Sequence, residues 1–189
     1  MNILIHTCCG NCLIYPLKIL REKGFEVHSF FYNHIHPFSE MLKRLEALQF
    51  LTKKEGINLI VREEYNLLRF IQNVVYREEE RCGYCYYSRL EATARLAAKS
   101  GFNMFTTTLL YSKHQKHEMI KEICTNLSKK FSIEFFYRDF RTGWSEGIEI
   151  SKSLGLYRQN YCGCIYSEKE RYIGKKDRFK VNKPILNNG

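Results

Sequence analysis

Hydrophobic positions along the chain follow two different spacings. Short runs of consecutive apolar residues between polar ones are typical of buried strands. They predict strands at Asn2–His6, Phe25–Tyr32, Asn58–Val61, Phe102–Thr108 and Ile133–Tyr137. Apolar residues three and four positions apart are typical of amphipathic helices. They predict helices at Cys12–Lys23, from Pro37 to just before Gly56, and at Tyr65–Tyr76, Arg89–Ser100, His114–Lys130, Glu146–Leu154 and Ser167–Ile173.

The alternation of strands and helices predicts an α/β fold with a parallel sheet flanked by helices. The chain has no repeat, low-complexity segment or evident domain boundary, so we expect residues 1–189 to form a single domain with a basic C-terminal tail from about residue 168. That tail is either solvated or an arm that contacts nucleic acid. Ligands of such sheets bind beyond the carboxyl ends of the strands, and we expect the functional residues there.

The composition indicates a globular protein with a basic surface. The 189 residues are 44% hydrophobic and 26% charged, which excludes a disordered chain, a collagen and a coiled coil. The net charge of +10 favours an anionic partner, most often a nucleic acid. The chain has no apolar run of membrane-spanning length and no signal peptide before Cys8, so we expect a cytoplasmic protein without a membrane partner.

Seven of the eight cysteines fall into three closely spaced groups. In a reducing compartment, such groups indicate metal or redox chemistry, because neighbouring thiolates can converge on one ion or cluster. We expect all three groups in loops, and we predict that they bind a metal or an iron–sulfur cluster. The groups are Cys8, Cys9 and Cys12; Cys82 and Cys85; and Cys162 and Cys164. The eighth, Cys124, lies beside the apolar face of a predicted helix, where we expect a packed core thiol.

The number of thiols suggests two metals rather than one. Four thiolates complete a zinc site or an iron–sulfur cluster, which leaves three for a second metal that has a position open to substrate. The alternative is one site with spare buried thiols. Since the side chains of adjacent residues usually point apart, we expect Cys8 and Cys9 to bind different metals.

Three further segments contain candidate contacts for an anionic ligand. Lys113 and Lys116 lie where a helix opens after a strand, a position that suits a phosphate and equally a solvated helix start. Aromatic and cationic side chains beside Cys162 can hold unstacked bases or pack around a metal. The candidate substrate contacts are Lys113, Lys116, His117, Arg141, Tyr157, Arg158 and Tyr161. Glu40 and Arg44, four residues apart on a helix, are expected to form an ordinary ion pair.

Five motifs occur in order along nearly the whole chain. They are His6-Thr-Cys-Cys-Gly-Asn-Cys12, Phe31-Tyr-Asn33-x-x-His36-Pro37-x-x-Glu40, Arg81-Cys-x-x-Cys85-x-x-x-Arg89-Leu90-Glu91, Thr106-Thr-Thr-Leu109 and Gly155-Leu-Tyr157-Arg-Gln159-x-Tyr161-Cys-Gly-Cys164. Together they resemble the QueH-type, cobalamin-independent epoxyqueuosine reductases. The resemblance extends from Asn2 to about Ser167.

The resemblance implies a fold, a reaction and cofactors. The fold is similar to the HUP-type Rossmann-like domains. The reaction reduces the epoxide of epoxyqueuosine, at the wobble position of tRNA, to the cyclopentene of queuosine. The cofactors are a [4Fe-4S] cluster and an additional iron ion, and we expect a ferredoxin- or flavodoxin-like electron donor. Many members have aspartate, an iron ligand, where this chain has Cys12, and a thiolate there is softer.

The resemblance also suggests how the ligands divide. We expect Cys82, Cys85, one of Cys8 and Cys9, and one of Cys162 and Cys164 to hold the cluster, with Cys12 and the remaining two holding the iron.

The reaction needs two electrons and two protons and releases water, so a side chain must protonate the leaving oxygen. The candidates are His6, His36, His117 and Asp139, of which we single out His6 and Asp139; His6 is equally suited to a hydrogen-bonded place in the core. Two other functions remain open. One is a zinc-stabilised RNA-binding module without catalysis, and the other is thiol–disulfide exchange at Cys82 and Cys85.

Overall fold

The computed structural model describes residues 1–173 of the chain. In this part, the strands form one five-stranded parallel sheet in the order β3-β2-β1-β4-β5. The strands are β1 (Asn2–His6), β2 (Glu26–Phe31), β3 (Asn58–Val61), β4 (Met104–Thr107) and β5 (Glu134–Phe135). The predicted α/β class with a parallel sheet is therefore confirmed.

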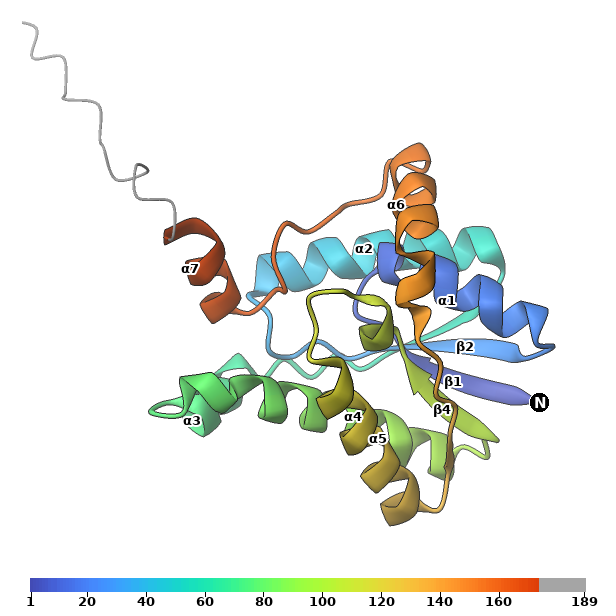
Figure 1. Cartoon of the computed structure of the whole chain (residues 1–189), viewed down its shortest axis with the longest axis horizontal. Coiled ribbons are helices and arrows are strands. Elements are labelled where there is room, and N and C mark those ends of the chain that lie inside the picture. The colour runs from blue at the N-terminus through green and yellow to red at the C-terminus, as the bar shows by residue number, and fades with distance from the viewer. Residues whose placement is uncertain (174–189) are drawn as a thin grey trace, which may run out of the picture.

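Helices cover both faces of the sheet (Figure 1). Helices α1 and α2 lie on one face, α4 and α5 lie on the other, α6 packs on α1, and α3 packs on α4. The helices are α1 (Gly10–Glu22), α2 (Phe38–Glu55), α3 (Leu67–Val74), α4 (Arg81–Lys99), α5 (His117–Phe131), α6 (Trp144–Ser153) and α7 (Ile165–Ile173). Within residues 1–173, three short 3-10 segments, which the hydrophobic pattern did not predict, lie at Glu78–Glu80, Thr108–Tyr111 and Phe140–Gly143.

The alternation of side chains along β1 produces a core on each face of the sheet. Ile3 and Ile5 pack with residues of α1 and α2, whereas Leu4 packs with residues of α4 and α5. All three side chains are fully buried. Close packing of α1 against α2 depends on Gly10, because a Cβ at this position would lie 2.5 Å from the backbone oxygen of Ala47.

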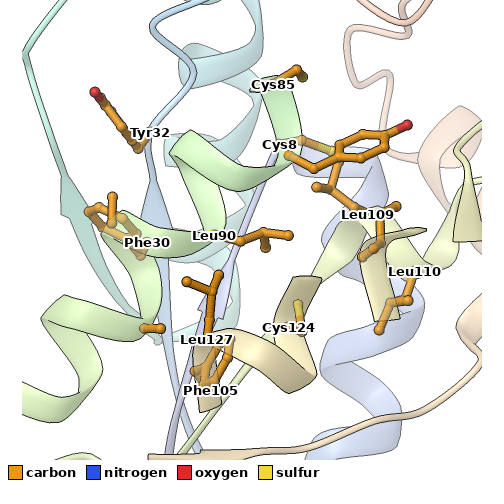
Figure 2. Packing of buried hydrophobic residues seen from close by; sticks show 14 of the residues in the cluster. Cys8, Phe30, Tyr32, Cys85, Leu90, Phe105, Leu109, Leu110, Cys124 and Leu127 are labelled. Carbon is orange, nitrogen blue, oxygen red and sulfur yellow. The ribbon is translucent and has the colours of Figure 1, made fainter. Parts of the chain in front are cut away.

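Cys124 belongs to the core on the α4 and α5 side. Its side chain is fully buried, and burial raises the pKa of its thiol. Figure 2 shows Cys124 at the level of Leu110 and Leu127, whereas Cys8 and Cys85 lie together toward one end of the same core. The prediction of a packed core thiol is confirmed.

Two boundaries differ from the sequence-based expectation. Helix α4 begins at Arg81 rather than near Arg89, so Cys82 and Cys85 lie in its first turns and not in a loop. The polar residues of this stretch are compatible with a helix whose inward face buries Cys85 and Tyr86. Cys12 also lies inside a helix, because α1 starts at Gly10. The expectation that every cysteine group lies in a loop is therefore wrong.

The sheet reverses its strand order between β1 and β4. From β1 the chain adds β2 and β3 on one side, whereas β4 and β5 lie on the other. The loop after β1 contacts the loop after β4, since the Cys8 backbone N–H donates to the Thr108 hydroxyl over 3.1 Å. This switch point is the usual ligand site in open parallel sheets.

Two expectations concern the chain as a whole. A single domain over residues 1–189 stays a prediction. Of the basic tail predicted from about residue 168, the first six residues are the end of α7, and the rest lies outside the described residues. Within residues 1–173, no helix is both long enough and apolar enough to cross a membrane.

Candidate metal and active site

The first cysteine group converges on one point at the end of β1. The sulfurs of Cys8, Cys9 and Cys12 all lie within 4.8 Å of one another, and those of Cys8 and Cys9 are 3.7 Å apart. Cys9 and Cys12 are paired as a disulfide in the structure, so they must be reduced before they can bind a metal. The expectation that Cys8 and Cys9 point apart is wrong, because the chain turns at Cys9 from strand to helix and the alternation of a strand ends there.

The other two groups lie beside the first. Arg89 of α4 donates to the Cys85 sulfur over 2.8 Å and has the sulfurs of Cys162 and Cys8 as electrostatic neighbours. The Cys85 thiol in turn has Cys82, Cys162 and Cys164 as electrostatic neighbours. Segments that are far apart in the sequence therefore bring all seven cysteines to the carboxyl edge of the sheet. This gathering agrees with the predicted metal site, although no ligand assignment follows from it.

Burial governs the chemistry of these thiols. Removal from water raises the pKa of Cys85 to about 12, against the opposing effect of Arg89, and it also raises the pKa of Cys162. Such thiols are neutral near pH 7 when nothing binds them. A metal ion or cluster removes their protons, so the site is suited to bound metal rather than to free, reactive thiolates.

Polar groups donate hydrogen bonds to three of the cysteine sulfurs. The Gln115 amide donates to the Cys162 sulfur over 3.2 Å, and the Gln159 amide donates to the Cys9 sulfur over 3.2 Å. The backbone N–H of Ser167, at the start of α7, donates to the Cys164 sulfur over 3.4 Å. Such second-sphere contacts orient metal ligands and tune the bound metal.

A buried ion pair holds the segment that contains the last two cysteines. The Arg44 Nε donates to Glu40 over 2.7 Å, and these side chains are only 2% and 6% exposed. The Arg44 Nη2 donates to the carbonyl of Cys162 over 3.0 Å, and the Tyr157 hydroxyl donates to Glu40 over 2.6 Å. Glu40 and Arg44 do form a pair, but a buried one that fastens residues 157–162 to α2, and not an ordinary surface pair.

A cavity of about 580 Å³ opens onto the sulfurs. Cys8, Cys12 and Cys162 line it, and Trp144 and His114 lie on its wall. Its charge is mostly positive, because the lining includes one acidic residue, Glu170, and four arginines. These are Arg44, Arg89, Arg158 and Arg171. The cavity suits an anionic ligand with a planar group.

Only some of the candidate substrate contacts lie at the cavity. Arg158 and Tyr161 line the cavity. The hydroxyl of Tyr157 contacts Glu40 instead. Four others lie outside the cavity lining: Lys113, Lys116, His117 and Arg141. His117 accepts or donates a hydrogen bond at the Tyr137 hydroxyl, 3.1 Å away, and Arg141 pairs with Asp139.

His6 and Asp139, the two residues predicted to protonate the leaving oxygen, do not line the cavity either. His6 is fully buried, 3.0 Å from the Thr107 hydroxyl, and burial holds its pKa well below the usual range. Asp139 pairs with Arg141, which lowers the pKa of Asp139 to about 2. Near pH 7, His6 is therefore a neutral imidazole and Asp139 a carboxylate, so neither is in its acidic form. His36 is equally buried, and burial followed by Arg44 lowers its pKa.

Sequence reasoning missed several residues that shape the site. Arg89, Gln159 and Glu40 stood in the motifs, but only as part of the pattern. Asn11 also stood in a motif, between Cys9 and Cys12, whereas Trp144 and Gln115 had no signal of their own, because packing alone brings them to the cavity. Their proximity to the sulfurs depends on the fold rather than on spacing in the sequence.

Fold and site together define a class: a parallel α/β protein with a thiol-lined, basic cavity at the switch point of its sheet. Within this class, the family model of the epoxyqueuosine reductase QueH matches residues 3–170. The chain therefore belongs to this family. The family resemblance and the oxidoreductase class expected from the sequence are confirmed.

Two relatives support the same assignment. The epoxyqueuosine reductase QueH of Dehalococcoides mccartyi is 40% identical over 172 residues, covering 90% of this chain and 94% of that protein. The protein of the same name from Thermotoga maritima is 36% identical over 181 residues, covering 90% and 92%.

A similar fold occurs in a more distant protein. The crystal structure of a predicted subunit of tRNA methyltransferase from Methanocaldococcus jannaschii matches with a TM-score of 0.57 at 11% identity, covering 80% of this chain and 74% of that one. At this level of identity, the match concerns the fold alone.

Proposed function

We propose that this protein reduces the epoxide of epoxyqueuosine in tRNA to the alkene of queuosine, in the cytoplasm, with electrons from a ferredoxin- or flavodoxin-like donor. Membership of the QueH family supports the reaction. The observation that most supports the chemistry is the gathering of seven cysteines from three distant segments around one basic cavity.

The donor set fits a [4Fe-4S] cluster with an additional iron. Cys8, Cys9 and Cys12 lie close enough together to hold a single ion. The remaining four thiols, of Cys82, Cys85, Cys162 and Cys164, match the number that a cluster requires. This division replaces the mixed one suggested by the resemblance. When bound, the cluster supplies single electrons and the iron acts as a Lewis acid on oxygen.

The side chains of the cavity bind and orient the substrate. Arg158 and Arg171 provide positive charge for the backbone of the anticodon. Trp144 offers an aromatic surface to an unstacked base. His114 is the histidine of the cavity lining, and it replaces His6 and Asp139 as the candidate proton donor to the leaving oxygen.

The decisive experiment uses protein purified without oxygen and tRNA that contains epoxyqueuosine. With a reductant present, nucleoside mass spectrometry should show loss of one oxygen, and the protein should contain about five iron and about four sulfide ions per chain. Cys162→Ala should lose the activity, whereas the matched variant Cys124→Ala, which changes a core thiol, should keep it.

Two outcomes would contradict the proposal. Protein that contains iron and sulfide but leaves the epoxide intact would refute the reaction. Zinc without sulfide, even after anaerobic reconstitution, would favour the RNA-binding module without catalysis.

A further inference from the structure

Arg89 is a buried cation in the middle of the cysteine site. It lies in α4, and only 2% of the residue is exposed. Its Nη2 donates to the Cys85 sulfur over 2.8 Å, its Nε donates to the Cys85 carbonyl over 3.1 Å, and its Nη1 donates to the Asn33 amide oxygen over 3.1 Å. The three hydrogen bonds of the guanidinium are therefore accepted by neutral oxygens and a sulfur, and not by a carboxylate.

No carboxylate in residues 1–173 forms an ion pair with Arg89. Arg44, the other large buried arginine, differs in this respect, because Glu40 neutralises it. Burying a guanidinium without an anion is costly, so its counter-charge must come from the groups that face it. The Cys85 sulfur contacts the guanidinium directly, the sulfurs of Cys162 and Cys8 lie with Arg89 on the same cavity lining, and these sulfurs and the Tyr86 hydroxyl act on it electrostatically.

We propose that Arg89 is the counter-cation of the bound iron–sulfur cluster and that it raises the reduction potential of the cluster. The inference rests on the proposed function, which supplies the cluster. Each electron that enters a cluster adds one negative charge, and a fixed positive charge within the same low-dielectric site stabilises that reduced state. The hydrogen bond from Nη2 to the Cys85 sulfur acts in the same direction. Arg89 is thus a positioning and electrostatic residue rather than one that touches substrate.

Three variants of the full chain test the inference. Arg89→Gln removes the charge, Arg89→Lys keeps it, and Arg95→Gln removes an equal charge from the exposed side of the same helix, where the arginine side chain is 53% exposed. Each is purified and reconstituted without oxygen. Iron and sulfide are counted, far-UV circular dichroism checks the fold, and the midpoint potential is measured by a dye-mediated titration followed by electron paramagnetic resonance.

We expect Arg89→Gln to titrate at a lower potential than the wild type. Arg89→Lys should stay between the two, and Arg95→Gln should match the wild type. If Arg89→Gln is folded but assembles no cluster while Arg89→Lys does, the charge requirement is equally supported. A wild-type potential in Arg89→Gln, or loss of the cluster from both Arg89 variants, would overturn the inference.

The readouts separate this inference from the proposed function. The potential is measured without epoxyqueuosine, so a lowered potential in Arg89→Gln stands even if the protein reduces no epoxide. Wild-type protein that takes up no iron and sulfide refutes the proposed cofactor and, with it, the role of Arg89. A loaded wild type with an unshifted Arg89→Gln refutes the role of Arg89 alone.

Discussion

Replacing Arg44 with methionine should destabilise the protein strongly, because it leaves Glu40 as a buried, unpaired charge. The two side chains are 2% and 6% exposed and 2.7 Å apart, so water cannot solvate the remaining carboxylate without a rearrangement. Removing one partner of such a pair costs about 3–5 kcal/mol. The variant also loses the hydrogen bond to the Cys162 carbonyl, so the fall in the free energy of unfolding should lie toward the upper end.

Urea denaturation of the reduced, metal-free protein, followed by far-UV circular dichroism, measures the effect. The matched control is Arg95→Met, which breaks another pair four residues apart, with Glu91, whose side chains are 53% and 24% exposed. An exposed pair contributes less than about 1 kcal/mol. The double variant Glu40→Gln/Arg44→Met should recover part of the loss, because no unpaired charge remains. If Arg44→Met and Arg95→Met cost the same, the pair does not stabilise this region as described.

Three further predictions follow from other buried positions. Gly10→Ala should cost at least about 1–3 kcal/mol in the same urea assay, because its Cβ would meet the Ala47 backbone, whereas Gly83→Ala, with 4.0 Å to the nearest side chain, should cost nothing. Cys124→Ala should lower the free energy of unfolding by about 1–2 kcal/mol and leave the iron content unchanged; a loss of iron would make Cys124 a ligand. Burial lowers the pKa of His34 to about 4, so the unfolded chain takes up a proton that the folded protein does not. The free energy of unfolding should therefore fall, by up to about 3 kcal/mol, as the pH drops from about 6.5 to about 4, and His34→Gln should show a flatter profile.

The pattern of hydrophobic positions was sufficient for the fold because strands such as β1 and β3 are short, almost continuously apolar runs. Asn2–His6 and Asn58–Val61 were predicted with the bounds that the structure shows. The start of α4 was missed because the residues from Arg81 onward are polar and aromatic, and nothing local distinguishes them from a loop. Their helical state depends on tertiary burial of Cys85 and Tyr86.

The cysteines of the candidate site could be recognised from the sequence, but the residues around them could not. Seven thiols in three closely spaced groups were sufficient to predict a metal site. Whether Glu40 and Arg44 are exposed or buried depends on how the segment of residues 157–162 packs on α2, and their spacing is the same in both cases. Likewise, Lys113 and Arg141 come from segments at the carboxyl edge of the sheet, yet the cavity is lined by other side chains.

The distribution of the cysteines also determines when the site can form during synthesis. The ribosome makes Cys8 directly after β1, whereas Cys162 and Cys164 emerge only after β1 to β5 have been made. Chains fold from the N-terminus as they are made, so the sheet can assemble while the cysteine site still lacks Cys162 and Cys164. The full set of thiols proposed to bind the metal is therefore available only after translation of these residues, and a nascent chain arrested before Cys162 would expose five clustered thiols to oxygen and to unsuited metals.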